Sequence, residues 1–357
     1  MISAEKPEEQ YLKGRGAQFN PHNHFQIHSY VKEHSEGIDD WENENHKTTF
    51  IIGKSKSIVN KVVSPDVGMA YSLNPYQGCE HGCTYCYARN THEYWGFSAG
   101  LDFERKVIVK KDAPLLFKKF LGRKGWNAET ISLSGNTDCY QPAEREYKLT
   151  RQLLEIALAY KQPIGMITKN SLILRDLDIL QEMAKLNLCM VYLSINSLDE
   201  KLRSKMEPRT TTVRQRLKVV EELSKAGIPT GVMVAPLVPG LSDHEIPAIL
   251  KTIASCGAES AGYTIVRLNG AIGPIFEDWL RQNFPDRFDK VWHMIQSCHG
   301  GQVNDSRFGE RMRGEGNIAK MIHDTFKLHC RINHLNVKRI HLDSSLFAVP
   351  GTQISLF

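Results

Sequence analysis

Residues 163–195 read PIGMITKNSLILRDLDILQEMAKLNLCMVYLSI and contain the repeating unit of the central region of the chain. A strand-length apolar run, PIGMIT, is followed by an amphipathic stretch, DLDILQEMAKL, and then by a second apolar run, LCMVYLSI. Short apolar runs that alternate with helical stretches are typical of βα units, in which right-handed crossovers place neighbouring strands parallel. This stretch therefore predicts an α/β protein with a parallel sheet.

The same alternation extends from about residue 66 to residue 268. Six runs have the composition of strands, namely GMAYSL, TISLSG, PIGMIT, LCMVYLSI, PTGVMVAP and SAGYTIVRL. Six strands are too few for an eight-unit barrel, which leaves a partial six-unit barrel or an open sheet. In either architecture the carboxyl ends of the strands line the site, and polar motifs follow five of the runs.

The two ends of the chain differ from this central region. Residues 1–65 are polar and rich in His, Asn and Glu, so we expect an irregular N-terminal arm that lies over the main domain. Residues 269–345 contain three helical patterns and are expected to form a C-terminal helical extension. Residues 346–357 lack periodicity and are expected to be a flexible tail.

Composition favours a cytoplasmic protein. The 357 residues contain no apolar run long enough to span a bilayer, and the N-terminus lacks the apolar stretch of a signal peptide, so no membrane association is expected. The eight cysteines form one tight cluster and five single residues, which is typical of a metal site or of catalysis rather than of a disulfide framework. The net charge of +5 permits a nucleic-acid partner without requiring one.

The cysteine cluster lies in the loop GCEHGCTYCYAR at residues 78–89, where Cys79, Cys83 and Cys86 form a CxxxCxxC spacing. Three interpretations compete. A structural zinc ion takes four ligands and would need His81 or a distant residue as the fourth. A CxxC redox pair would use two of the thiols and leave Cys79 unexplained. A 4Fe-4S cluster held by three cysteines leaves one iron with an open coordination position.

The loop resembles the signature of the radical S-adenosylmethionine (SAM) superfamily, in which an aromatic residue stands before the third cysteine, as Tyr85 does here. The resemblance covers about residues 66–268 and implies a partial (β/α)6 barrel of the TIM type. It also implies a 4Fe-4S cluster and SAM as cofactors, with Cys79, Cys83 and Cys86 as the metal ligands. In this superfamily an external electron donor such as flavodoxin or ferredoxin drives cleavage of SAM to a 5′-deoxyadenosyl radical, which abstracts hydrogen from a substrate.

The resemblance assigns contacts with SAM to the ends of the other strands. SGNTD at residues 134–138 occupies the place of the superfamily's glycine-rich motif, which accepts hydrogen bonds from the methionine ammonium. Lys169 is suited by charge to the methionine carboxylate, and Ser194 and Asn196 are suited to the ribose or the carboxylate. The expected SAM-binding residues are Tyr85, Ser134, Gly135, Asn136, Thr137, Lys169, Ser194, Asn196, Val234 and Pro236.

Several motifs together are similar to the spore-photolyase-like branch of the superfamily, whose members are often labelled DNA repair photolyases. These motifs are NPYQGCEHGCTYCYAR, SGNTDCYQPAE, ITKNSLILRD, MEPRT and GVMVAPLVPGLSD. In the photolyases of this branch a cysteine returns hydrogen to the product, whereas the corresponding position here is Gly135. Cys139 is a candidate catalytic hydrogen donor, with Tyr140 as a second, and the alternative for Cys139 is a packed structural thiol.

A basic break between the last two helical patterns, RFGERMRGEG at residues 307–316, bears on a nucleic-acid partner. Arg307, Arg311 and Arg313 are candidate phosphate contacts, since arginine and lysine neutralise most phosphate groups in such complexes. A solvated surface is the alternative. Among nucleic acids DNA is favoured, and the reacting nucleotide has to be single-stranded or extruded from the duplex.

The last five residues, QISLF, resemble the QLSLF-type motif by which bacterial polymerases and repair proteins dock on the DNA sliding clamp. Gln353, Leu356 and Phe357 are the contact residues that this resemblance implies. A flexible tail that orders on binding is suited to such a peptide. The alternative is that Leu356 and Phe357 pack back onto the body of the protein.

The leading interpretation is a radical SAM enzyme that binds a 4Fe-4S cluster, cleaves SAM and abstracts hydrogen from a nucleic acid, as in DNA repair or modification. A second interpretation keeps the cofactors and changes the substrate to RNA, a peptide or a metabolite. A third, from another class, is a nucleic-acid-binding protein with a structural cluster and no turnover.

Overall fold

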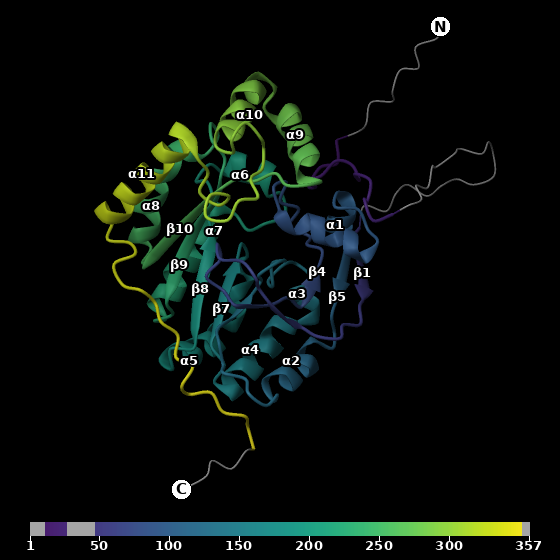
Figure 1. Cartoon of the computed structure of the whole chain (residues 1–357). Helices are drawn as coiled ribbons and strands as arrows, with labels where there is room; N and C mark the ends of the chain where they lie inside the picture. Colours follow the sequence, from purple (N-terminus) through teal and green to yellow (C-terminus); the bar gives the residue numbers. More distant parts are fainter. Residues whose placement is uncertain (1–10, 27–46, 352–357) are drawn as a thin grey trace, which may run out of the picture.

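The computed structural model describes residues 11–26 and 47–351, and its centre is a seven-stranded sheet (Figure 1). Neighbouring strands follow the order β10-β9-β8-β7-β6-β3-β2. The strands from β3 to β10 are parallel, and β2 runs antiparallel to β3 at the edge. The six predicted strands are confirmed, and they are the six parallel strands of the sheet. The seven strands are β2 (Val59–Lys61), β3 (Tyr71–Leu73), β6 (Ile131–Leu133), β7 (Ile164–Thr168), β8 (Cys189–Ser194), β9 (Thr230–Leu237) and β10 (Ser260–Ile265).

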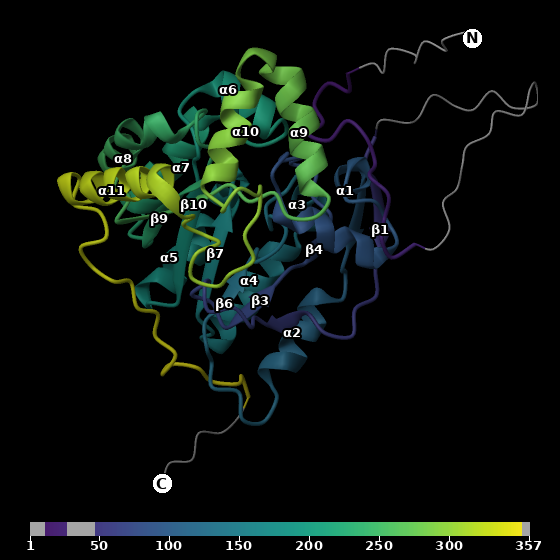
Figure 2. The ribbon, with the colours of Figure 1, turned by 45° about the horizontal axis from the view of Figure 1, so that its top comes forward.

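The sheet forms a partial barrel that stays open on one side. Among the described strands, β3 pairs only with β2 and β6, and β10 pairs only with β9, so the first and last parallel strands are not joined. Figures 1 and 2 show helices around the outside of the sheet, as expected for a partial (β/α)6 barrel. The helices between β5 and β10 are α2 (Ala113–Leu121), α3 (Glu144–Tyr147), α4 (Leu149–Tyr160), η2 (Ser171–Asp176), α5 (Leu177–Lys185), α6 (Glu200–Met206), α7 (Val213–Lys225), η3 (Asp243–Glu245) and α8 (Ile246–Ser255).

The helical stretch at residues 144–160 is interrupted in the structure. Lys148 has a φ of 50°, in the left-handed region, and separates α3 from α4. The turn directs the carboxylate of Glu144 into the interior, where it accepts hydrogen bonds from the Tyr76 hydroxyl and from the Thr150 backbone N–H. A buried carboxylate needs such partners, and a straight helix would not bring them together.

Strand pleating separates the apolar core from the interior of the barrel. On β8, Val191 and Leu193 are fully buried and belong to the apolar core that the sheet shares with the outer helices. Successive side chains of a strand point to opposite faces, so Ser194 faces the other way. The carboxyl ends of the strands therefore present polar residues to the barrel interior.

Residues 49–61 correct the expectation of an irregular N-terminal arm. β1 (Thr49–Ile52) pairs parallel with β5 (Lys106–Val109), which also pairs with β4 (Tyr76–Gln77), and β2 joins the main sheet. The partner of β1 comes from a segment more than 50 residues later, so no local pattern announced the pairing. The short helices η1 (Tyr87–Trp95) and α1 (Leu101–Arg105) connect this small sheet to the cysteine loop.

Helices follow the barrel and pack against the cysteine loop. Trp279 and Phe276 share an apolar cluster with Cys83 and Tyr85, so the C-terminal helices bury one side of the loop. None of the helices in the described part of the chain combines the length and the apolar character needed to cross a membrane. The helices after β10 are α9 (Ile272–Asn283), η4 (Pro285–Arg287), α10 (Phe288–Ser297) and α11 (Gly316–Ile332).

After α11 the chain runs back along the outside of the barrel (Figure 1). The backbone N–H of Ala348 donates to the carbonyl of Tyr160 at 3.1 Å, just before β7 begins. The described chain therefore ends near the amino-terminal ends of the strands, away from the ends that carry the polar motifs. The predicted clamp contacts lie outside the described residues, and they are Gln353, Leu356 and Phe357.

Residues 11–26 lie against the cysteine loop and are anchored by one carboxylate. Glu104 accepts hydrogen bonds from the backbone N–H groups of Gly16 (3.1 Å) and Ala17 (2.8 Å). It also forms an ion pair with Arg89 at 2.6 Å, and both side chains are fully buried. The amino-terminal segment is thus fixed to a charged pair beneath the loop.

Replacing Glu104 with alanine should destabilise the protein strongly. The change leaves the Arg89 guanidinium buried without its carboxylate, and we expect the free energy of unfolding in urea to fall by about 3–5 kcal/mol. The control is Glu277→Ala, which breaks a solvent-exposed pair with Arg281 and should cost less than about 1 kcal/mol. Equal losses in the two variants would contradict the anchoring role.

Candidate active site

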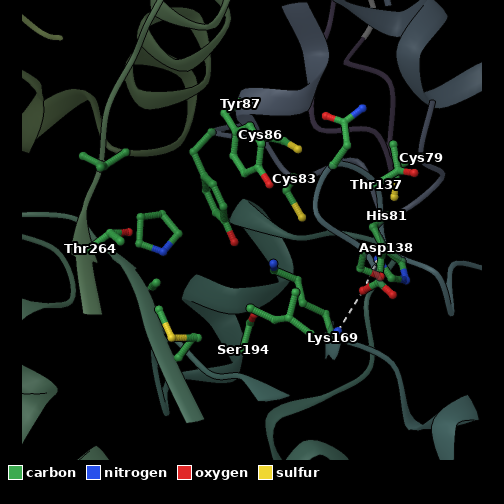
Figure 3. Close-up of a pocket in the computed structure, with 18 of the residues that line it drawn as sticks. Cys79, His81, Cys83, Cys86, Tyr87, Thr137, Asp138, Lys169, Ser194 and Thr264 are labelled. Atoms are coloured by element: carbon green, nitrogen blue, oxygen red, sulfur yellow. Dashed lines mark hydrogen bonds and ion pairs between the residues drawn. The ribbon is translucent and has the colours of Figure 1, made fainter. Parts of the chain in front are cut away.

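A cavity of about 260 Å³ opens at the carboxyl ends of the parallel strands (Figure 3). The cysteine loop and the ends of β6 to β10 form its wall. Figure 3 shows the Lys169 side chain directed toward Cys83, with Thr264 on the side opposite Asp138. The polar residues that line the cavity are Cys79, His81, Cys83, Tyr85, Cys86, Tyr87, Ser134, Asn136, Thr137, Asp138, Thr168, Lys169, Ser194, Thr264 and Arg267.

Backbone contacts hold the cysteine loop in place. The N–H of Cys79 donates to the carbonyl of Phe103 at 2.9 Å, and the N–H of Thr84 donates to the carbonyl of Met206 at 3.1 Å. These bonds tie the loop to two segments distant in sequence. The loop is therefore a fixed wall of the cavity.

The amino-terminal segment touches the loop backbone directly. A Cβ atom at Gly16 would collide with the carbonyl oxygen of Gly82. Gly82 itself has a φ of 67°, a conformation that favours glycine. The two segments therefore cross with no side chain between them, and the loop is covered on this side.

The three thiols fit a cluster better than a single metal ion. Cys79 and Cys83 are buried and Cys86 is half-buried, and burial raises the pKa of all three thiols. In residues 11–26 and 47–351, no three His, Cys, Asp or Glu side chains converge closely enough to hold one ion. In a 4Fe-4S cluster each cysteine binds a different iron, so the thiols surround a volume rather than a point.

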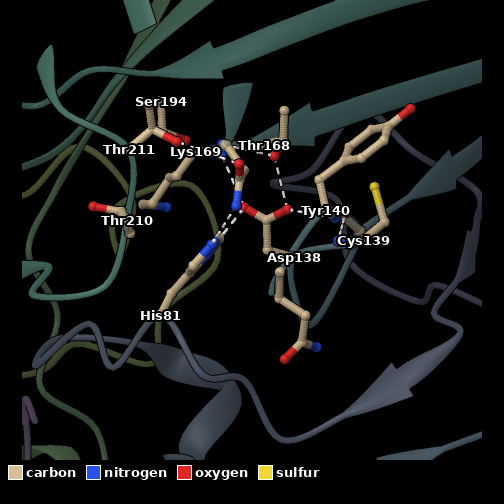
Figure 4. Close-up of polar contacts among 12 residues, drawn as sticks. His81, Asp138, Cys139, Tyr140, Thr168, Lys169, Ser194, Thr210 and Thr211 are labelled. Carbon is tan, nitrogen blue, oxygen red and sulfur yellow. Dashed lines mark hydrogen bonds and ion pairs between the residues drawn. The ribbon is translucent and has the colours of Figure 1, made fainter. Parts of the chain in front are cut away.

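Asp138 ties the cysteine loop to the ends of the strands (Figure 4). Its carboxylate accepts hydrogen bonds from the Lys169 backbone N–H (2.8 Å) and the Thr168 hydroxyl (2.7 Å), and His81 Nδ1 lies 3.4 Å away. Burial alone would raise the pKa of Asp138, but His81 and these hydrogen bonds outweigh it and lower the pKa to about 2. Asp138 is therefore charged at neutral pH.

Lys169 is a charged group inside the cavity. Burial disfavours its ammonium form, but the nearby Cys83, Glu207 and Asp138 favour it, and the pKa of Lys169 is raised overall. Ser194 lines the same wall. A lysine that keeps its charge while buried is suited to bind a carboxylate.

Glu207, from the MEPRT motif, organises the wall behind Lys169. Its carboxylate accepts hydrogen bonds from the Tyr85 hydroxyl and from Arg216 Nη2, the latter at 2.5 Å. Arg216 also donates to the backbone carbonyl of Ser194 at 2.8 Å. Burial would raise the pKa of Glu207, but Arg216 and Lys169 lower it, so the carboxylate is a fixed negative charge.

Most of the expected SAM-binding residues reach the cavity. Gly135 does not line the cavity, but its carbonyl oxygen accepts a hydrogen bond at 2.6 Å from the hydroxyl of Tyr87, which does. Ser134, Asn136 and Thr137 of this turn line the cavity, and the Thr137 hydroxyl donates to the backbone carbonyl of Tyr76 at 2.8 Å. The predicted residues that line the cavity are Tyr85, Ser134, Asn136, Thr137, Lys169, Ser194 and Pro236.

Besides Gly135, two expected SAM-binding residues do not line the cavity. Val234 is fully buried in the apolar core, and its neighbours Met233 and Ala235 line the cavity instead. The reason is the alternation of side chains along β9. Asn196 lies behind the wall, with its amide nitrogen 3.5 Å from the Tyr85 hydroxyl.

Cys139 and Tyr140 also lie away from the cavity. Both are fully buried in the apolar core, and the Tyr140 hydroxyl donates to Asp176 at 3.1 Å. Figure 4 shows the side chains of Cys139 and Tyr140 on one side of Asp138 and His81 on the other. The structure therefore corrects the expectation that either residue donates hydrogen to a substrate, and it places Cys139 as a packed thiol.

The three predicted phosphate contacts differ in their surroundings. Arg307 is paired with Asp305 at 2.6 Å, Arg311 is paired with Asp66, and Arg313 is exposed. None of the three lines the cavity. Two of these guanidinium groups are thus committed to internal ion pairs.

Sequence reasoning missed several residues of the cavity. His81 and Asp138 lie inside motifs that had been singled out, and their polar character was the available signal. Arg267 and Met312 come from the last strand end and from the C-terminal loop, where no local pattern marks them. The missed residues are His81, Tyr87, Asp138, Thr168, Thr264, Arg267 and Met312.

Comparison with known proteins agrees with this geometry. The family model of the radical SAM superfamily matches residues 73–253, half of the chain. The chain belongs to the radical SAM superfamily. An uncharacterized protein of Mycobacterium tuberculosis (strain H37Rv) is 35% identical over 234 residues, which cover 65% of this chain and 69% of that protein. An uncharacterized protein of Methanocaldococcus jannaschii is 28% identical over 248 residues, 69% of this chain and 88% of that one.

Two further radical SAM proteins are similar to this chain. The solved structure of spore photoproduct lyase complexed with dinucleoside spore photoproduct has a TM-score of 0.60, 18% identity, and coverage of 84% of this chain and 85% of that one. At this identity the likeness shows the fold. A radical SAM Nalpha-GlyT isomerase of Pseudomonas phage M6 is 25% identical over 224 residues, which cover 59% of this chain and 45% of that protein.

Membership of the radical SAM superfamily implies a 4Fe-4S cluster and SAM as cofactors. When bound, the cluster supplies the electron for reductive cleavage of SAM. Cys79, Cys83 and Cys86 are the residues that would hold the cluster, and Lys169, which lines the same cavity, would hold the SAM carboxylate.

Replacing Cys83 with alanine should abolish cluster binding. The change removes one of three thiols, so we expect loss of the visible iron–sulfur absorption and of most protein-bound iron after anaerobic reconstitution. The matched control is Cys139→Ala, because Cys139 is a buried thiol outside the cavity and its loss should leave the iron content unchanged. Retention of a full cluster by the Cys83 variant would exclude this thiol as a ligand.

Replacing Lys169 with methionine should weaken SAM binding. A hydrogen bond to a charged group contributes about 1.5–3 kcal/mol, so the Kd for SAM should rise by about ten- to a hundredfold. Calorimetry on the reconstituted protein measures this change. Lys185→Met, at an exposed lysine paired with Glu182, is the control and should leave the Kd unchanged. An unchanged affinity in the Lys169 variant would remove its assigned role.

Proposed function

We propose that this radical SAM enzyme abstracts a hydrogen atom from a nucleic acid, with DNA favoured, in a repair or modification reaction. The observation that carries the proposal is that the cavity has two sides, one formed by the cysteine loop and the end of β6 and the other by the end of β10. Cys79 and Asp138 lie on one side and Thr264 on the other, and Arg267 follows Thr264 at the same strand end (Figure 3). A radical formed beside the thiols would face the side of the cavity that carries the Arg267 guanidinium, a group that can contact a phosphate.

The proteins similar to this chain support a nucleotide-sized substrate. Spore photoproduct lyase has the same fold and binds a dinucleoside in its solved complex. The phage relative is an isomerase rather than a lyase, so one fold serves different reactions after the first step. We therefore propose hydrogen abstraction from a nucleic acid and assign no class to the reaction that follows.

The spore photoproduct itself is not the proposed substrate. Gly135 stands where the photolyases of the resembling branch have their hydrogen-donating cysteine. Among the described residues that line the cavity, the thiols are those of Cys79, Cys83 and Cys86, which are assigned to the cluster. Among these residues no further cysteine is therefore present to return a hydrogen atom to the product.

The proposal includes partners and a location that derive from the sequence. An external flavodoxin or ferredoxin would supply the electron, and the C-terminal QISLF motif would dock the enzyme on the DNA sliding clamp. Both partners are cytoplasmic, which is the location we propose. A nucleic-acid-binding protein without turnover is set aside, because the superfamily is one of enzymes.

The proposed function is tested by anaerobic turnover with labelled nucleic acid. The reconstituted protein, SAM and a strong reductant are incubated with deuterated single-stranded DNA or RNA, and 5′-deoxyadenosine is analysed by mass spectrometry. We expect 5′-deoxyadenosine only when the thiol of Cys83 is present, and deuterium in it only with DNA.

Three outcomes of this experiment differ in meaning. Deuterium transfer from RNA would reassign the proposed substrate from DNA to RNA. Formation of 5′-deoxyadenosine without transfer from either polymer would contradict the nucleic-acid proposal. Absence of 5′-deoxyadenosine from a protein with a full cluster would contradict turnover under these conditions.

A further inference from the structure

We propose that Arg267 binds a phosphodiester group of the substrate and is therefore a substrate-binding residue of the cavity. This inference rests on the proposed function and names the chemical group that the site recognises. Arg267 follows β10, the last strand of the barrel, and lines the cavity together with Thr264.

Arg267 has no acidic partner among the described residues, unlike the arginines around it. Its hydrogen bond goes to the backbone carbonyl of Asp305 at 3.4 Å, which is long. The Asp305 carboxylate is taken by Arg307 at 2.6 Å, and the Asp66 carboxylate is taken by Arg311. The carboxylates nearest to Arg267 are thus occupied, and its guanidinium keeps donors for a ligand.

The surroundings of Arg267 favour an anionic ligand. Burial lowers the pKa of Arg267, and the charge of Arg311 lowers it further, whereas the attraction of Asp66 and Asp305, which are paired with other arginines, does not offset these two effects. A phosphate can form two parallel hydrogen bonds with a guanidinium and offset both. Lys169 is a separate position, because it is enclosed by Cys83 and Glu207 beside the expected SAM site.

The backbone fixes Arg267 at the open side of the barrel. The N–H of Ile265 donates to the carbonyl of Met312, and the N–H of Leu268 donates to the carbonyl of Val303, both at 3.0 Å. These bonds lie on either side of Arg267 and prevent its backbone from shifting. The C-terminal loop therefore supports the strand end where the sheet has no further strand.

An exposed aromatic ring in the cavity, with a second outside it in the C-terminal loop, favours a phosphodiester over a simple carboxylate as the ligand. Tyr87 is 53% exposed, lines the cavity and is held by its hydrogen bond to Gly135. Phe308 is 59% exposed, and the Arg311 guanidinium lies 4.4 Å from its ring centre. Sites for single-stranded nucleic acid combine rings that stack on bases with cations that hold the backbone.

The test measures binding of short DNA to the full chain, reconstituted anaerobically with its cluster and SAM. The probe is fluorescein-labelled octathymidylate, followed by fluorescence anisotropy at several salt concentrations. Arg267→Gln should weaken binding by about ten- to a hundredfold. It should also reduce the slope of log affinity against log salt concentration by about one, as expected for the loss of one phosphate contact. Arg267→Lys should lose less, and Arg281→Gln, at an exposed arginine of α9, should bind as the wild type does.

A second probe isolates the phosphate contact. Octathymidylate with uncharged methylphosphonate linkages should bind the wild-type protein weakly, and Arg267→Gln should bind it no more weakly. Iron content and SAM affinity of Arg267→Gln should equal those of the wild type, which shows that the variant is folded and that Arg267 does not hold SAM.

Several outcomes would overturn the assignment. One is that the Arg267→Gln variant binds octathymidylate as tightly as the Arg281→Gln variant does. Another is that Arg267→Gln loses affinity for SAM while its affinity for DNA is unchanged. If DNA-dependent formation of 5′-deoxyadenosine persists together with that unchanged affinity, the proposed function stands without Arg267. If the wild-type protein binds no octathymidylate, the inference fails, and the deuterium experiment decides separately whether the proposed function fails with it.

Discussion

The carboxylate of Asp138 is the interaction on which the cavity depends. It joins the cysteine loop, through His81, to the end of β7, through the Thr168 hydroxyl and the Lys169 backbone. A buried charge persists only where donors surround it, so these segments are held in one arrangement. The position of the Lys169 backbone relative to the cysteine loop is fixed by this carboxylate.

Buried ion pairs act together with the apolar cluster of the C-terminal helices to define the rest of the cysteine loop's surroundings. Glu207 and Arg216 fix the wall behind Lys169, and Glu104 and Arg89 fix the segment that covers the loop. Such pairs contribute little net stability compared with apolar residues of the same volume. Their directional hydrogen bonds instead specify positions, which a site that must orient two cofactors and a substrate requires.

The sequence predicted the architecture well because strands and helices leave local patterns, and the thiols because their spacing is itself a pattern. The errors have physical causes of two kinds. Val234 and Cys139 were assigned to the cavity by proximity in sequence, but pleating and a turn direct their side chains into the core. Glu144 and Arg267 depend on partners far along the chain, and a single sequence does not contain those contacts.

The crossing of Gly16 over Gly82 constrains the order in which the protein matures. The amino-terminal segment is synthesised first, but its anchor, Glu104, leaves the ribosome almost ninety residues later. Until then the nascent segment lacks the carboxylate that accepts its backbone hydrogen bonds. Docking of the segment over the loop therefore has to follow the synthesis of residue 104, so the first residues of the described chain are not the first to reach their final position.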